Sequence, residues 1–216
     1  MVQIVQCEDG TQTVFSPQFQ ETYHSIKGAI QESSHVFLNA GLNHLLDQGY
    51  STIRILEFGF GTGLNALLVL NLVKDLQNIS IEYVGIEKYP LDKTEISRLS
   101  YHDEVNVHIS DWLKLHEGNW HIGNFKGKVL HKDFNDFALQ TKFDMVFHDA
   151  FSPSIQNEYW RAPFLQKVYE SMNKGGVLVS YCAQGEFRRE LKRIGFTTES
   201  LPGPLGKREM TRATKL

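Results

Sequence analysis

The segment "ILEFGFGTGLNALL" (residues 55–68) sets three alternating glycines between two apolar runs. Residues 53–58 form a short β-rich run, whereas residues 64–77 form a long apolar run without glycine or proline. This order predicts a buried strand, a tight loop and a buried helix. Glycine allows positive φ angles and a close approach of the backbone to a ligand, here at Gly59, Gly61 and Gly63.

The loop is typical of a site for a nucleoside without a pyrophosphate. A dinucleotide fingerprint, G-x-G-x-x-G, would place glycine at position 64, where this chain has Leu64. The loop also lacks the lysine of a Walker-type phosphate loop, which excludes the nucleoside triphosphatases that use such a loop. A simpler alternative is that the glycines mark only a turn.

Acidic side chains are predicted at the ends of four strands, namely Glu57, Glu87, Asp133 and Asp149. Glu87 follows the glycine loop by one helix and one strand, where a carboxylate can accept hydrogen bonds from ribose hydroxyls. Asp133 could meet the exocyclic amine of a base. Such acids favour a cationic cofactor, which indicates S-adenosylmethionine rather than NAD. The alternative is that the acids cap helices.

Strands and helices alternate along the rest of the chain. We predict strands at 81–87, 143–149 and 177–182, and helices at 91–102, 162–172 and 185–195. This alternation predicts an α/β fold with a doubly wound, mostly parallel sheet, in which ligands bind at the carboxyl ends of the strands.

Other segments are less regular. Residues 103–118 are compatible with a strand or a capped helical turn, and the residues on either side of Lys126-Gly127 predict a hairpin. Lys174-Gly175-Gly176 is expected to end a helix in a turn, and the tail from Thr197 predicts a final hairpin.

The first fifty residues differ in pattern from the rest. Asp9-Gly10 between apolar segments predicts a β-hairpin, and leucines at helical spacing predict a helix over residues 32–46. We therefore expect an N-terminal extension over 1–50, a small hairpin and helix packed on the core, and a cofactor-binding domain over 51–216.

Composition narrows the class of protein. The chain has 216 residues, 41% of them hydrophobic, and a net charge of −3, which allows a sizeable core but disfavours binding nucleic acid by overall charge. Neither the two cysteines nor the nine histidines show metal-ligand spacing, so we expect no metal. Without a signal peptide or an apolar run near ~20 residues, we expect a cytoplasmic protein with no membrane contact.

Two motifs, "ILEFGFGTGLNALL" and "FHDAFSPSIQNEYW" (residues 147–160), together resemble the methyltransferase domain of MnmC, the tRNA 5-methylaminomethyl-2-thiouridine biosynthesis protein. The stretches "TYHSIKGAIQESSHVFLNAGL" (22–42) and "GPLGKREMTRA" (203–213) also match its pattern. The D-x-F-x-P element at Asp149, Phe151 and Pro153 is the most specific part. The chain departs from the family at Ala150, where glycine is usual.

The resemblance implies a Rossmann-like class I methyltransferase that uses S-adenosylmethionine. Its substrate would be the exocyclic amine of 5-aminomethyl-(2-thio)uridine at the wobble position, in the anticodon loop of tRNA. In MnmC this domain is usually fused to a flavin-dependent oxidase. The chain ends at Leu216 without a second G-x-G-x-x-G, so we expect a stand-alone methyltransferase whose precursor comes from a separate enzyme.

We assign three groups of site residues on these grounds. Asp149 is the expected catalytic residue, because its carboxylate could orient the amine and accept a proton from it. The cofactor would be held by Glu57, Gly59, Phe60, Gly61, Gly63, Glu87 and Asp133. The substrate would be bound by Phe151, Pro153 and Trp160 at the base, and by Lys207 and Arg208 at phosphates. Ordinary packing is the alternative for each aromatic.

Two other functions stay open on the sequence alone. One is methyl or aminopropyl transfer to a small amine, against which the basic C-terminal residues argue. The other is a non-catalytic, cofactor-binding module that interacts with RNA, against which the intact glycine loop and Asp149 argue. The oligomeric state is not predicted.

Overall fold

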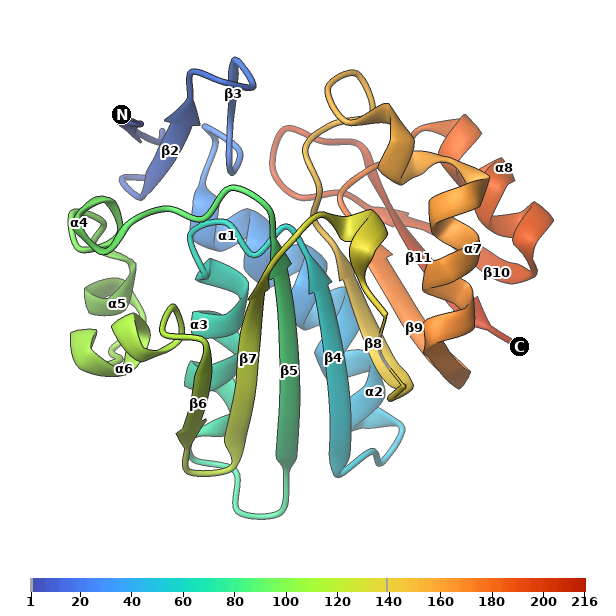
Figure 1. Ribbon diagram of the computed structural model, residues 1–216, viewed down its shortest axis with the longest axis horizontal. Helices are drawn as coiled ribbons and strands as arrows, with labels where there is room; N and C mark the ends of the chain where they lie inside the picture. The colour runs from blue at the N-terminus through green and yellow to red at the C-terminus, as the bar shows by residue number, and fades with distance from the viewer. Residues whose placement is uncertain (1, 139) are drawn as a thin grey trace.

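The computed structural model describes residues 2–138 and 140–216, which form one large β-sheet with helices on both faces and a smaller second sheet (Figure 1). The large sheet has the order β10-β11-β9-β8-β4-β5-β7-β6. Its strands are β4 (Thr52–Phe58), β5 (Ser80–Glu87), β6 (Asn119–Ile122), β7 (Phe125–His131), β8 (Phe143–His148), β9 (Met172–Ser180), β10 (Phe196–Pro202) and β11 (Glu209–Lys215). The small sheet contains β1 (Gln3–Gln6), β2 (Gln12–Ser16) and β3 (Glu21–Thr22).

The centre of the large sheet is parallel. Strands β7, β5, β4, β8 and β9 pair in parallel, whereas β6 pairs antiparallel with β7 and β11 with β9. From β4 the chain proceeds outward to β5 and β7, and it then returns to β8 on the other side of β4. The predicted doubly wound α/β fold is therefore confirmed, and the strand order reverses between β4 and β8, where ligand crevices form in such sheets.

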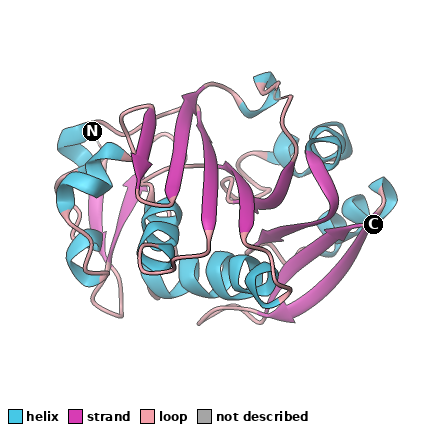
Figure 2. Ribbon diagram, turned by 90° about the horizontal axis from the view of Figure 1, so that it is seen from below, coloured by secondary structure: helices cyan, strands magenta, loops and turns pink. Residues whose placement is uncertain are grey.

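Helices cover both faces of the sheet, as Figure 2 shows from below. One face is covered by α1 (Ala29–Ser33), η1 (Ser34–Leu42), α2 (Asn43–Asp47) and α3 (Leu64–Val73), the other by α7 (Ala162–Ser171) and α8 (Gly185–Ile194). Shorter elements are α4 (Lys93–Ile96), α5 (Tyr101–Glu104), α6 (Ile109–Lys114), η2 (Phe134–Asp136) and η3 (Asn157–Trp160). In the part of the chain that the structure describes, no helix is long and apolar enough to cross a membrane.

Side-chain alternation explains why both faces of the strands are covered. Ile55 and Phe147 belong to the core on the α3 side, whereas Leu56 and Val146 belong to the core on the α7 side. Successive residues of a strand point to opposite faces, so a strand that is apolar at every position needs a helix layer on each face.

The N-terminal fifty residues divide into two parts. The small sheet lies at one end of the molecule, but the helical stretch over residues 29–47 packs on the large sheet, where Phe37 contacts Phe147 with ring centroids 5.2 Å apart. Its side chains share one hydrophobic core with α3. The predicted helix therefore belongs to the main core, and Cys7 and Val14 of the hairpin are buried in the same hydrophobic cluster.

Three local predictions need correction. The predicted helix over 91–102 is divided between α4 and α5, whereas the helical alternative for residues 103–118 is confirmed as α6. The hairpin of β6 and β7 turns at residues 123–124, and Gly127 lies inside β7 rather than in the turn. Glycine is needed at this position of the strand, because a side chain would collide with the carbonyl oxygen of Tyr83 and the ring of Trp120. Residues 174–176 lie within β9, where the pairing with β8 jumps from Met172 to Val177.

We expect Phe37→Ala to lower the free energy of unfolding by about 3–5 kcal/mol, because it leaves a cavity between η1 and the sheet. Denaturant unfolding should still show one cooperative transition, since the helix and the sheet share a core. The half-exposed Leu76→Ala serves as the control. A second transition that Phe37→Ala alone affects would instead indicate an independent N-terminal unit.

Candidate active site

A pocket opens at the carboxyl ends of β4, β5 and β8, beside the point where the strand order reverses. It holds about 950 Å³ of empty space, including its mouth, which is within the range of small-molecule sites. Its wall includes seven residues predicted from the sequence: Gly59, Phe60, Gly61, Glu87, Asp149, Phe151 and Lys207. The sequence motifs thus converge on one cavity.

The glycine loop needs its glycines. The φ angle is +90° at Gly59, +53° at Gly61 and +72° at Gly63, a region that side chains rarely adopt. A Cβ atom on Gly59 would lie 2.3 Å from the carbonyl oxygen of Asp149. The loop can therefore pass close to the end of β8 only with glycine at this position.

Glu87 ends β5 and is directed at the glycine loop. Its Oε2 accepts a hydrogen bond from the amide of Gly61 at 2.9 Å, and its Oε1 accepts one from the amide of Tyr89 at 2.8 Å. Burial raises the pKa of Glu87 above its ordinary value of 4.5, while these amides lower it. The carboxylate thus fixes the loop and also lines the pocket.

An amide links two buried acids across the strand ends. Nδ2 of Asn65, at the start of α3, donates to Oε1 of Glu57 at 2.7 Å and to Oδ2 of Asp149 at 2.9 Å. Burial and the nearby Asp149 raise the pKa of Glu57 well above 4.5. Glu57 lies behind Asn65 rather than in the pocket wall, so Asn65 is the residue that faces the cavity. The sequence reasoning missed Asn65, although it follows the glycine loop directly.

Asp149 is held where β8 ends. Its amide donates to the carbonyl oxygen of Phe58 at 2.9 Å, which continues the pairing with β4. Burial raises the pKa of its carboxyl from 3.8 to about 8; Glu32 adds to this rise, whereas Asn65 and Lys207 oppose it. A carboxyl with such a pKa can exchange a proton near neutral pH.

Aromatic side chains from the N-terminal part close one side of the pocket. The ring of Phe19 lies 4.5 Å from that of Phe151 and 5.4 Å from that of Tyr89, and Tyr23 meets Phe151 at 5.2 Å. All four rings line the cavity. No sequence signal assigned Phe19 or Tyr23 to the site, because their neighbours in space come from distant loops.

Trp160 does not face this cavity, which corrects its expected role as a stacking partner. It is 2% exposed, its Nε1 donates to the carbonyl oxygen of Phe151 at 2.9 Å, and its ring packs on His148 at 4.4 Å. Pro153 likewise lines two neighbouring hollows and not the main pocket. Both residues shape the loop that carries Phe151.

The other predicted residues have varied positions. Gly63 begins α3 behind the pocket wall, while Phe60 lines the pocket and contacts His116 with ring centroids 5.2 Å apart. Asp133 stands just outside the wall, where it binds Lys88 at 2.7 Å and Tyr159 at 3.0 Å. Among the described residues, no group of three or more His, Cys, Asp or Glu could hold a metal ion.

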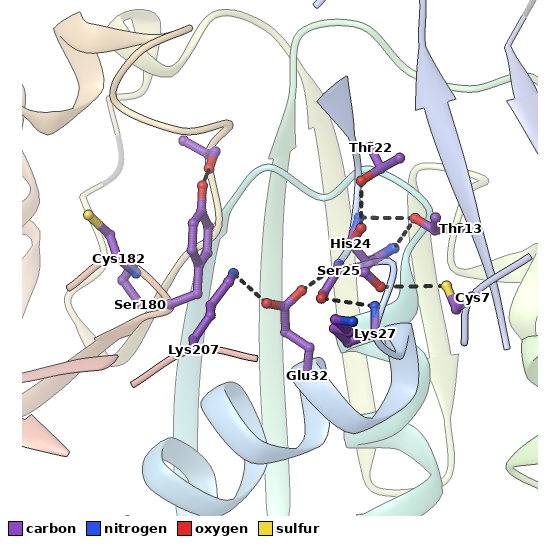
Figure 3. Close-up of polar contacts among 12 residues, drawn as sticks. Cys7, Thr13, Thr22, His24, Ser25, Lys27, Glu32, Ser180, Cys182 and Lys207 are labelled. Carbon is purple, nitrogen blue, oxygen red and sulfur yellow. Dashed lines mark hydrogen bonds and ion pairs between the residues drawn. The ribbon is translucent and has the colours of Figure 1, made fainter. Parts of the chain in front are cut away.

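The two C-terminal basic residues differ. Lys207 reaches into the pocket, where its Nζ lies 2.5 Å from Oε1 of Glu32 and 4.2 Å from the ring centroid of Tyr181 (Figure 3). Arg208 is exposed at the edge of an adjacent hollow. The charge of Lys207 is thus paired with Glu32 at the pocket wall, and its expected phosphate contact stays a prediction.

Comparisons with known proteins agree with this geometry. A family model described as S-adenosyl-L-methionine-dependent methyltransferase matches residues 86–216. The chain is 32% identical to the tRNA 5-methylaminomethyl-2-thiouridine biosynthesis bifunctional protein MnmC of Cupriavidus metallidurans, over 92% of this chain and 32% of that protein. It is 30% identical to the MnmC protein of Leptospira interrogans, over 92% and 33%. The chain spans about a third of the length of these curated relatives.

A solved structure is also similar. MNMC2 from Aquifex aeolicus has a TM-score of 0.83 and 29% identity, and the match covers 99% of this chain and 70% of that one. Because the family model matches more than half of the chain, the chain belongs to the S-adenosyl-L-methionine-dependent methyltransferase family. S-adenosylmethionine is therefore its methyl donor, as the glycine loop and acids predicted.

The pocket also fits this cofactor chemically. Oδ1 of Asn65, which lines the pocket, is a buried acceptor that has no hydrogen-bond partner among the residues the structure describes. Such acceptors are costly unless a donor reaches them, and an ammonium group supplies donors and a positive charge. The acidic wall thus suits a cationic ligand better than a polyphosphate.

We expect Asn65→Ala to slow methyl transfer about 10–100-fold, because hydrogen bonds to charged groups contribute ~1.5–3 kcal/mol each. Steady-state kinetics would measure the loss, with the exposed Asn78→Ala as the matched control. An unchanged turnover number in Asn65→Ala would show that the link between Glu57 and Asp149 is not needed for the reaction.

The raised pKa of Asp149 predicts a pH-dependent stability. Between the ordinary pKa of 3.8 and the folded pKa of about 8, the folded state binds more protons than the unfolded state. The contribution of Asp149 to stability is therefore complete below the first value and is lost as the pH rises through the second. The Tm of the ligand-free protein should fall from pH 5 to pH 9, and by a smaller amount in Asp149→Asn. Equal slopes would contradict this.

Proposed function

We propose that this methyltransferase transfers a methyl group from S-adenosylmethionine to the exocyclic amine of 5-aminomethyl-(2-thio)uridine at the wobble position of tRNA. The product would be 5-methylaminomethyl-(2-thio)uridine. The observation that carries the proposal is the buried Asp149 carboxyl, which lies in the same pocket wall as the glycine loop. The names of the MnmC relatives support the choice of tRNA as the substrate.

The pocket residues divide into two subsites under this proposal. Glu87 would accept hydrogen bonds from the ribose of the cofactor, and Asn65, which Glu57 holds from behind, would receive its ammonium group. The bound cofactor supplies an electrophilic methyl group. Phe151 and Phe19, whose rings are 4.5 Å apart, would bind the uracil ring, which must leave the anticodon stack to reach the pocket.

Asp149 would activate the amine. A primary amine with a pKa near ~10.4 is mostly protonated at pH 7 and attacks only as the free base. An aspartate with the ordinary pKa of 3.8 is a poor acceptor for that proton, whereas a pKa of about 8 brings the two groups closer. Asp149 would take the proton, and the nitrogen would bond to the methyl carbon as the carbon–sulfur bond breaks.

The RNA-binding surface would surround the mouth of the pocket. Arg208 edges a hollow that is also lined by Tyr181 and Lys207, both of which line the main pocket, so the hollow is adjacent to the pocket. A phosphate next to the modified uridine could contact Arg208 there. A separate enzyme would supply the aminomethyl precursor, and an anticodon-loop substrate would place the reaction in the cytoplasm.

The test is an assay with purified protein, S-adenosylmethionine and tRNA that carries 5-aminomethyluridine at the wobble position, followed by nucleoside mass spectrometry. We expect the methylated nucleoside from the wild type and a loss of about 10²–10⁴-fold in rate for Asp149→Ala, because proton transfer is lost. Cofactor binding, measured by calorimetry, should persist. The exposed Asp47→Ala is the matched control.

Two outcomes would contradict the proposal. Methylation of spermidine-type amines but not of tRNA would indicate a small-amine transferase. Cofactor binding without transfer to either substrate would indicate a binding module that lacks catalysis.

A further inference from the structure

An ion pair in the pocket joins α1 to the loop between the last two strands. Glu32, on α1, is 8% exposed, and its Oε2 accepts a hydrogen bond from the amide of Ser25 at 2.7 Å. Its Oε1 lies 2.5 Å from Nζ of Lys207, which comes from the loop between β10 and β11 (Figure 3). Both side chains line the same cavity as Asp149.

Tyr181 connects this pair to the end of β8. The ammonium group of Lys207 lies 4.2 Å from the centroid of the Tyr181 ring, which limits its freedom to move. The hydroxyl of Tyr181 donates to the carbonyl oxygen of Ala150 at 2.8 Å, one residue after Asp149. The pair is thus fixed to the segment that carries the catalytic carboxyl.

The other titratable groups around Asp149 are acids, an ion-paired lysine and two neutral side chains. The acids of the pocket region are Glu21 on β3, Glu57 on β4 and Glu87 on β5. Lys88 is bound to Asp133 at 2.7 Å. Burial lowers the pKa of His24 to about 4 and raises the pKa of Tyr181, so both are neutral near pH 7. Lys207 thus contacts Glu32 and also lines the same pocket as Asp149, so its charge can act on both carboxyl groups.

We propose that the Glu32–Lys207 ion pair controls the electrostatic environment of Asp149. In this pair Lys207 compensates the negative charge that Glu32 places in the pocket. The inference rests on the proposed function, because an amine substrate requires Asp149 as its proton acceptor. It gives Lys207 a role inside the pocket, in addition to the phosphate contact expected from the sequence.

The physical argument gives opposite signs for the two partners. Glu32 raises the pKa of Asp149 by repulsion between like charges, whereas Lys207 lowers it by attraction. Removing Lys207 leaves the charge of Glu32 uncompensated, and removing Glu32 leaves that of Lys207. Removing both leaves a neutral pair again. A role limited to packing would not produce shifts that reverse and then cancel.

The experiment measures the titration of Asp149 by carbon NMR of labelled aspartate carboxyls in the cofactor-free protein, with the signal assigned from its loss in Asp149→Asn. We expect Lys207→Gln to move the titration midpoint up by about 0.5–1 pH unit and Glu32→Gln to move it down by a similar amount. The double variant should return to the wild-type midpoint, and Lys207→Arg should stay close to it.

A matched control comes from a Lys–Glu pair outside the pocket. Lys93 lies 2.6 Å from Glu117 on the exposed surface, so Lys93→Gln should leave the midpoint unchanged. Shifts of one sign in all variants, or no shift in Lys207→Gln, would overturn the proposal. The Lys207 variants decide the matter even if Glu32→Gln does not fold.

Kinetics separate this inference from the proposed substrate. With aminomethyluridine tRNA, the acid limb of the kcat profile should move in the same direction as the Asp149 midpoint in each variant. NMR shifts of the expected signs without any tRNA methylation by the wild type would retain the role of the ion pair and reject the substrate. Wild-type tRNA methylation with an unshifted midpoint would do the reverse.

Discussion

The burial of three carboxyl groups close together is the constraint on which this site depends, because burial raises the pKa of each of them. Glu57, Glu87 and Asp149 come together because the carboxyl ends of neighbouring parallel strands meet at one edge of the sheet. Each acid accepts a hydrogen bond from a donor without net charge: Glu87 from the amides of Gly61 and Tyr89, and Glu57 and Asp149 from the side-chain amide of Asn65. The pocket therefore holds carboxyl groups that a nearby cation helps to ionise, which suits a sulfonium cofactor and an ammonium substrate.

The glycine loop and Asn65, which is two residues after Gly63, both meet the end of β8. Gly59 passes so close to the carbonyl oxygen of Asp149 that a methyl group would not fit. Asn65 can then reach both carboxylates with one amide nitrogen. A charged donor at this position would neutralise the pocket, whereas an amide orders the acids and leaves their charge available.

Segments far from the motifs complete the cavity. The N-terminal segment contributes Phe19 and Tyr23, α1 contributes Glu32, and the loop between the last two strands contributes Lys207. Figure 1 shows the small N-terminal sheet and the C-terminal hairpin on opposite sides of the strand ends. A pocket assembled from both ends of the chain ties its integrity to the folding of the whole domain.

The sequence by itself determined the layer structure and the centre of the site. Its apolar runs and glycine loop predicted β4, α3, β5, β8 and the parallel sheet, because periodicity and glycine are local signals. It also placed Glu87 and Asp149 at strand ends. It did not find Asn65, Phe19 or Glu32, and it misjudged Trp160, which packs in the core rather than in the pocket. Those roles depend on contacts between residues distant in sequence, as in the pairing of Glu32 with Lys207 across 175 positions. Only the tertiary structure decides whether such a side chain meets the cavity, the core or an opposite charge.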